Sequence, residues 1–277
     1  MDIAGARFSS AKPPNPTWLA WGTERAGAFV VEGLDPVGAT LADTLGRQLP
    51  KVLAVDCPLG VPQGLAKLLV GLAANGSQVL ERLVASPPAE LDTTWARFAT
   101  ECPGALRLTD ALTHGAPSVT SPRPPVWRSL RALARILSGL RDRVALVPFD
   151  TLELLPTRSM VLEALPTGTL RLLGLPYLSY RGAPEGGPAP SPSDSAAARM
   201  QVLTGLPAAV GALGFRLEVP AFVVNACVTD THGDALDAVL CCVTAALATR
   251  GLWAPPPYSG PLAARVQLEG WIVRPGA

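Results

Sequence analysis

Apolar residues in this chain fall into short runs separated by polar, Pro and Gly residues, a pattern typical of alternating strands and helices. Runs at residues 17–21 (TWLAW) and 28–32 (AFVVE) flank the turn-prone sequence GTERAG, which predicts a β-hairpin. Apolar residues then recur at four-residue steps through residues 36–49, as on one face of a helix. A short buried strand is expected at residues 52–55, where the apolar run ends at Asp56.

The rest of the chain alternates in the same way and shows no internal repeat. Residues 88–125 give an irregular pattern, whereas a stripe of Leu residues marks a clear helix after it. Helices are expected at residues 63–84 (with a break at 75–76), 125–143, 194–213 and 233–250, and strands at 144–147, 160–165, 222–226 and 271–273.

Composition identifies a folded protein. Hydrophobic residues make up 48% and charged residues 16% of the 277 residues, which excludes an intrinsically disordered chain. The net charge of +1 excludes a histone-like polycation but is compatible with a local basic groove. The 5 cysteines are scattered without CxxC spacing, and no apolar run resembles a signal peptide or is long enough to span a bilayer. We therefore expect a cytoplasmic protein without a membrane partner.

Several reaction classes lack their sequence signatures. The chain has only 2 histidines, so a His-rich metal site and the HExxH zinc proteases are excluded. No GxxxxGK[ST] loop, GxGxxG fingerprint or GxSxG elbow is present, which disfavours P-loop, dinucleotide-binding and α/β-hydrolase chemistry. Any catalysis is therefore expected to depend on carboxylates.

Five carboxylates interrupt apolar sequence and are the candidate catalytic and metal-binding residues: Asp2, Asp56, Glu163, Asp234 and Asp237. The last two are three residues apart at the start of an apolar helix and so share one face of it. A buried carboxylate usually pairs, hydrogen-bonds or holds a cation. Their positions at strand ends and at a helix start favour a carboxylate cluster that binds two cations.

Each of these acids also has an ordinary structural explanation. Asp2 could be a frayed terminal charge, Asp56 could cap the following turn, and Glu163 could point outward from an edge strand. The pair in the helix could simply be first-turn acids favoured by the helix dipole. Both kinds of explanation stay open for the sequence alone.

Six segments, in order along the chain, resemble domain-of-unknown-function family 429, whose members are predicted RNase H-like nucleases. The segment LAVDCPLGVP resembles the family's AIDxPLGxP motif, and ALRLTD resembles its RxT[DE] segment. The other four are MDIAGARFSS, VLEALPTGTLRLLGLP, GDALDAVLCCVTAALA and EGWIVRP.

The resemblance implies a single RNase H-like α/β domain over residues 1–277, with a mixed five-stranded sheet flanked by helices. A large, mainly helical insertion is expected at about residues 63–158. Asp2 would lie on the first strand, Asp56 on the fourth, Glu163 on the fifth, and Asp234 and Asp237 on the last core helix. In such nucleases the acids hold two Mg²⁺ or Mn²⁺ ions, one of which helps to generate the attacking hydroxide while the other stabilises the leaving oxygen.

Three cations are expected to bind the phosphates of a nucleic-acid substrate: Lys12, Arg107 and Arg181. Arg107 is selected through the family's RxT[DE] segment, although surface charge or a local salt bridge would also explain each of them. Arg181 follows Tyr180 where the family often has lysine, and Asp2 lies almost at the N-terminus. The first departure changes the cation that is expected to bind phosphate. The second shortens the strand that is expected to carry a metal ligand.

Two other classes of function remain open. The first is a non-catalytic binding or scaffold module on the same fold, which the balanced charge favours slightly. The second, ranked last, is an actin-like kinase, which needs two such domains and a phosphate-binding loop. The preferred hypothesis is a Mg²⁺- or Mn²⁺-dependent nuclease, with the type of nucleic acid and the oligomeric state left open.

Overall fold

The computed structural model describes residues 2–7, 17–71, 75–113, 126–150, 157–181 and 191–275, with the side chains of residues 2–7, 39 and 126 left out. The chain forms two compact units. The first unit comprises residues 1–56, 164–254 and 273–277, and the second comprises residues 57–163 and 255–272.

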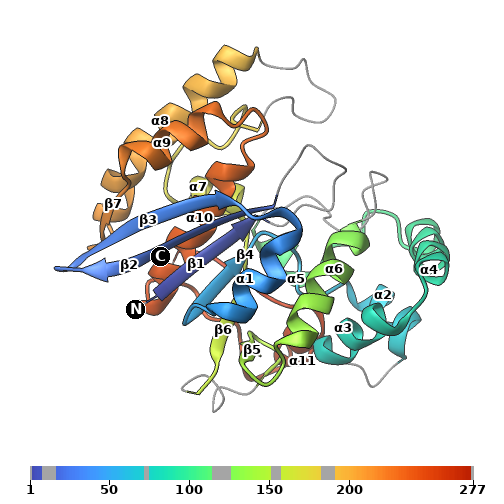
Figure 1. Ribbon diagram of the computed structural model, residues 1–277. Helices are drawn as coiled ribbons and strands as arrows, with labels where there is room; N and C mark the ends of the chain where they lie inside the picture. The colour runs from blue at the N-terminus through green and yellow to red at the C-terminus, as the bar shows by residue number, and fades with distance from the viewer. Residues whose placement is uncertain are drawn as a thin grey trace. The chain divides into compact units, whose positions relative to one another are not determined.

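The first unit is built on a mixed sheet with the strand order β4-β1-β2-β3-β7 (Figure 1). Strands β1, β2 and β3 are antiparallel neighbours, whereas β4 is parallel to β1. The hairpin between β2 and β3 turns at Ala26 and Gly27, both with positive φ, as a two-residue turn of this hand requires. The strands are β1 (Asp2–Arg7), β2 (Trp18–Arg25), β3 (Ala28–Pro36), β4 (Val52–Val55) and β7 (Arg216–Glu218).

Helix α10 (Asp234–Thr249) is the central helix of the first unit. It packs against β1, β2, β3 and β4 and also contacts α7 and α9 (Figure 1). Its residues are buried from Asp234 to Ala248, which explains why the helix is apolar on all sides. The other helices of this unit are α1 (Leu41–Arg47), α7 (Pro166–Leu172), α8 (Pro192–Gly211) and α9 (Ala221–Thr229), with a 3-10 turn at Gly38–Thr40.

The second unit is mainly helical. Helix α3 packs on α2 and α6, and α11 packs on α2 and α5, while β6 pairs with β5 and β8. Its helices are α2 (Gln63–Val70), α3 (Gly76–Ala85), α4 (Pro88–Glu101), α5 (Leu108–Leu112), α6 (Val126–Gly139) and α11 (Ala263–Glu269). Its strands are β5 (Val144–Leu146), β6 (Ser159–Ala164), whose last residue belongs to the first unit, and β8 (Ile272–Val273), which crosses the boundary.

The expected mixed α/β class is confirmed, and the helix predicted at residues 63–84 does break at Asn75–Gly76, where Asn75 caps α3. The strand predicted at residues 222–226 is wrong, because this segment lies in α9, where Val223 and Cys227 are buried at four-residue spacing. The irregular stretch that begins at residue 88 contains α4, which buries Leu91, Trp95 and Phe98.

Gly60, in the turn before α2, provides a test of the second unit's packing. A Cβ at this residue would lie 2.4 Å from the backbone C and O atoms of Glu269, which cannot move aside as a side chain would. We expect Gly60→Ala to lower the free energy of unfolding by about 1–3 kcal/mol. Gly46→Ala in α1 is the control, because no atom lies within 4 Å of its Cβ. Equal urea midpoints for the two variants would contradict the prediction.

Candidate functional site

Two aspartates of the first unit contact a single arginine, and we call Asp56, Arg181 and Asp237 the aspartate–arginine cluster. Asp56 follows β4 directly, and Asp237 lies in the first turn of α10. Nη2 of Arg181 donates to Oδ2 of Asp56 at 2.9 Å, and its Nε lies 2.7 Å from Oδ2 of Asp237. One cationic group therefore bridges two carboxylates from different elements.

The three side chains of this cluster differ in exposure. The side chain of Asp237 is 0% exposed, that of Asp56 is 10% exposed, and that of Arg181 is 33% exposed. Loss of solvation alone disfavours the charged guanidinium, but attraction to Asp237 and Asp56 outweighs it and raises the pKa of Arg181 well above its ordinary value. Arg181 is therefore a permanent cation that reaches solvent.

Tyr180 supplies a further contact to the buried aspartate. Its hydroxyl donates to Oδ1 of Asp237 at 2.7 Å. Burial and the neighbouring carboxylate raise the pKa of Tyr180 well above 10.0, so the hydroxyl remains a donor at neutral pH. Both oxygens of Asp237 thus contact polar side chains of the adjacent residues Tyr180 and Arg181.

The backbone that carries Tyr180 and Arg181 is anchored beside α10. Buried Arg199 donates from Nη1 to the carbonyl of Tyr180 at 2.8 Å and from Nη2 to that of Val228 at 2.9 Å. Gly233, at the start of α10, has φ +78°, and a Cβ there would lie 3.0 Å from the Tyr180 carbonyl oxygen. A glycine is needed here for both reasons.

The start of α10 carries a third aspartate, Asp234, three residues before Asp237. Asp234 is buried in the same helical turn as Asp237, where negative charge complements the helix dipole. Asp230 precedes them and accepts from the backbone N–H of Ala235 at 2.8 Å and of His232 at 3.2 Å. The dipole explanation for the acidic pair is therefore compatible with a role in a site.

The sheet register separates Asp2 from this cluster. Because β1 and β4 are parallel and Ala6 pairs with Val55, the β1 residue level with Asp56 is Arg7. Asp2 stands five positions earlier, about 16 Å back along the strand. The structure therefore places Asp2 and Asp56 toward opposite ends of neighbouring strands.

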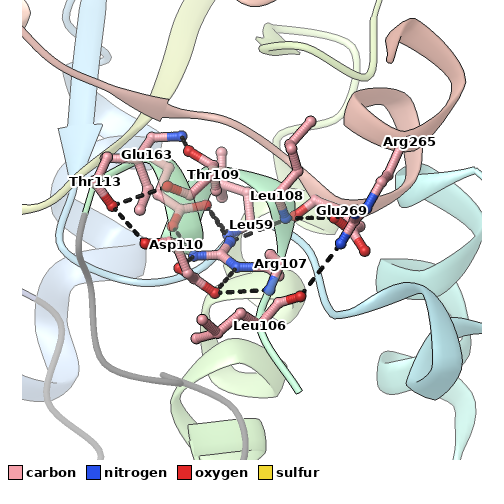
Figure 2. A network of polar contacts seen from close by, with 11 residues as sticks. Leu59, Leu106, Arg107, Leu108, Thr109, Asp110, Thr113, Glu163, Arg265 and Glu269 are labelled. Carbon is pink, nitrogen blue, oxygen red and sulfur yellow. Dashed lines mark hydrogen bonds and ion pairs between the residues drawn. The ribbon is translucent and has the colours of Figure 1, made fainter. Parts of the chain in front are cut away.

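A second polar cluster, the buried arginine network, lies in the second unit (Figure 2). Arg107 donates to both oxygens of Glu163, from Nη2 at 2.6 Å and from Nη1 at 2.8 Å. It also donates to both oxygens of Asp110, at 2.7 Å and 2.9 Å. The backbone N–H of Leu59 adds a hydrogen bond of 2.9 Å to Glu163. All three charged side chains are at most 3% exposed.

Glu269 extends this network at the end of α11 (Figure 2). Its carboxylate accepts from the backbone N–H of Gln63 at 2.9 Å and of Leu108 at 2.6 Å, at the first residues of α2 and α5. Arg265 donates to the same carboxylate at 2.8 Å. One buried side chain therefore caps two helices that are distant in sequence.

Burial is the largest single influence on the pKa values of Glu163 and Arg107. It raises the pKa of Glu163 above its ordinary value, and the two contacts from Arg107 oppose that rise. Burial alone would lower the pKa of Arg107, but the attraction of Glu163 and Asp110 exceeds this effect, so the pKa lies above its ordinary value. Arg107 therefore favours the charged form of Glu163, against the effect of burial.

The donor set of the aspartate–arginine cluster fits one hard divalent cation. Mg²⁺ in proteins is usually held by one or two carboxylates with waters and substrate phosphates, and Asp56 and Asp237 supply two carboxylates. Within the described residues, no group of three or more His, Cys, Asp or Glu side chains is arranged to hold a metal ion. Among the described residues the donor set fits one such ion, and the two-ion site remains a prediction.

A family model described as "Protein of unknown function (DUF429)" matches residues 13–259, which is most of the chain. The chain belongs to this family. No curated protein and no solved structure matches it. Among the described residues, no helix has the length and apolarity needed to cross a membrane.

Four of the segments that resemble DUF429 meet in the buried arginine network. They supply Leu59, Arg107, Asp110, Glu163 and Glu269. Glu269 is not among the site residues predicted from the sequence. A charged residue directly before Gly270 and Trp271, at the edge of an apolar segment, would have indicated a buried and partnered charge.

The predicted site residues divide among different places. Asp56, Asp237 and Arg181 are brought together, with Asp234 in the same helical turn, whereas Glu163 and Arg107 bind one another in the second unit. Lys12 lies outside the described residues. Of the two groups, only the first combines carboxylates with a partly exposed cation.

Removing the arginine of the buried network tests its structural role. Arg107→Met leaves two buried carboxylates without their shared cation, so we expect a loss of about 3–5 kcal/mol in the free energy of unfolding. Arg97→Met is the control, because Arg97 pairs with Glu101 on the surface, where the cost is about 0.5 kcal/mol or less. Urea unfolding of both variants measures the difference, and similar losses would contradict the structural role.

The same variant carries a pH signature. Without Arg107, the contacts that lower the pKa of Glu163 are gone and this pKa rises further above 4.5. The folded state then binds a proton more readily than the unfolded state, so its stability increases as pH falls toward the unfolded value. We expect the destabilisation of Arg107→Met relative to wild type to be smaller at pH 5 than at pH 7.5. A pH-independent difference would refute this assignment.

Proposed function

We propose that this DUF429 protein is a Mg²⁺- or Mn²⁺-dependent nuclease whose cation binds at Asp56 and Asp237. The observation that carries the proposal is the convergence of two carboxylates on one cationic group, at the end of a strand and the start of a buried helix. Such oxygen donors suit hard divalent cations. The meander β1–β2–β3 with β4 parallel to β1 supports an RNase H-like sheet as its scaffold.

The roles of the chain's own groups follow from their contacts. Asp56 and Asp237 supply the metal ligands, with Asp234 near them in sequence, and Tyr180 orients Asp237 through its hydrogen bond. Arg181 provides the positive charge for a substrate phosphate, because a guanidinium matches phosphate oxygens in pairs. A bound cation would polarise the phosphodiester and stabilise the charge that develops on it. Glu163 and Arg107 act as structural supports in this proposal.

A non-catalytic binding module is the second candidate, and one observation favours it. The β1 position level with Asp56 is occupied by Arg7 rather than by an acid, and Arg181 already pairs with Asp56 and Asp237. A guanidinium held in this position would bind a phosphate group without cleaving it.

Cleavage assays on single- and double-stranded DNA, RNA and an RNA–DNA hybrid with Mn²⁺ test the first proposal. We expect turnover in wild type and a loss of about 100-fold or more in Asp56→Asn and Asp237→Asn, since even outer-shell changes cost about 10- to 100-fold. Asp43→Asn, an exposed residue of α1, is the control that should keep full activity. Folded wild type that binds these nucleic acids without Mn²⁺-dependent cleavage would favour the binding module.

A further inference from the structure

We propose that Arg181 gates the cation site by competing with the divalent ion for the same carboxylate oxygens. This inference rests on the proposed function and adds a regulatory element to it: ion binding requires the guanidinium to leave, and the released guanidinium then pairs with the substrate phosphate.

The competition follows from the contacts. Arg181 approaches Oδ2 of Asp56 and Oδ2 of Asp237 at 2.9 Å and 2.7 Å, so it occupies the space between the two carboxylates. A cation that uses these oxygens cannot bind while the guanidinium remains, because both like-charge repulsion and overlap oppose it. Binding of the ion and retention of Arg181 are therefore mutually exclusive.

Exposure and geometry indicate which group moves. Asp237 is fully buried and its Oδ1 is fixed by Tyr180, whereas Arg181 is 33% exposed and has a path to solvent. Asp237 is thus held within the fold, whereas the side chain of Arg181 contacts it from a position that is open to solvent on one side. Arg199 and Gly233 hold the backbone at residue 180 in place, so the change is confined to the arginine side chain.

The released guanidinium has a specific use in a nuclease. It remains charged at neutral pH, and it can donate two parallel hydrogen bonds to phosphate oxygens. Hydrogen bonds to a phosphodiester would replace the ion pairs that Arg181 loses when it leaves Asp56 and Asp237. The gate would thus favour the ion most when the substrate is present, which limits metal binding by the free protein.

Mn²⁺ titration by calorimetry tests the gate without an activity assay. We expect Arg181→Met to bind Mn²⁺ at least about tenfold more tightly than wild type, since a competing charge in direct contact is removed. Arg181→Lys should lie between them, because one ammonium cannot reach both carboxylates as the guanidinium fork does. Adding Asp56→Asn to Arg181→Met should abolish the gain. Thermal unfolding should show a larger Mn²⁺-induced rise in Tm for Arg181→Met than for wild type.

Arg141→Met is the matched control, because Arg141 is similarly exposed and pairs with both oxygens of Asp150 in the second unit. Its Mn²⁺ affinity should equal that of wild type. Equal or weaker Mn²⁺ binding by folded Arg181→Met overturns the gate and leaves the proposed cation site standing. Absence of Mn²⁺ binding in both wild type and Arg181→Met overturns the cation site itself. If Arg181→Met does not fold, Arg181→Lys decides, and an affinity no tighter than that of wild type overturns the gate.

Discussion

The pairing of Arg107 with two buried carboxylates is the interaction on which the second unit depends. Taking three charges out of water is costly, and the cost is met only because every oxygen of Asp110 and Glu163 accepts a hydrogen bond from the guanidinium. The contacts join the turn before α2, the start of α5 and strand β6, with Glu269 adding the end of α11. Few apolar contacts could impose this combination of segments so specifically.

The same chemistry has a different outcome in the first unit because the exposure is different. Arg107 is 1% exposed and cannot leave its carboxylates, whereas Arg181 reaches solvent. An enclosed arginine between two acids therefore fixes a fold, whereas in our proposal a partly exposed one is exchanged for another cation.

Failures of sequence reasoning have identifiable physical causes. The run FVVNA suggests a strand because Phe and Val favour sheets, yet Pro220 begins a helix there that buries Val223 and Cys227 on one face. Asp2 was expected near Asp56 because both border apolar strands, but only the register of β1 against β4 shows that they lie at different levels. Register depends on pairing between segments, which a local pattern does not contain.

The sequence by itself determined the mixed α/β class, the β2–β3 hairpin, the buried helix with its acidic first turn, and membership of DUF429 through short ordered motifs. These features depend on residue spacing and on local turn chemistry, both of which are visible in one dimension. Tertiary structure alone decided which acid meets which cation: Glu163 meets Arg107, while Asp56 and Asp237 meet Arg181. Charged groups find partners by distance in space, and these pairs are separated by 56 or more residues of chain.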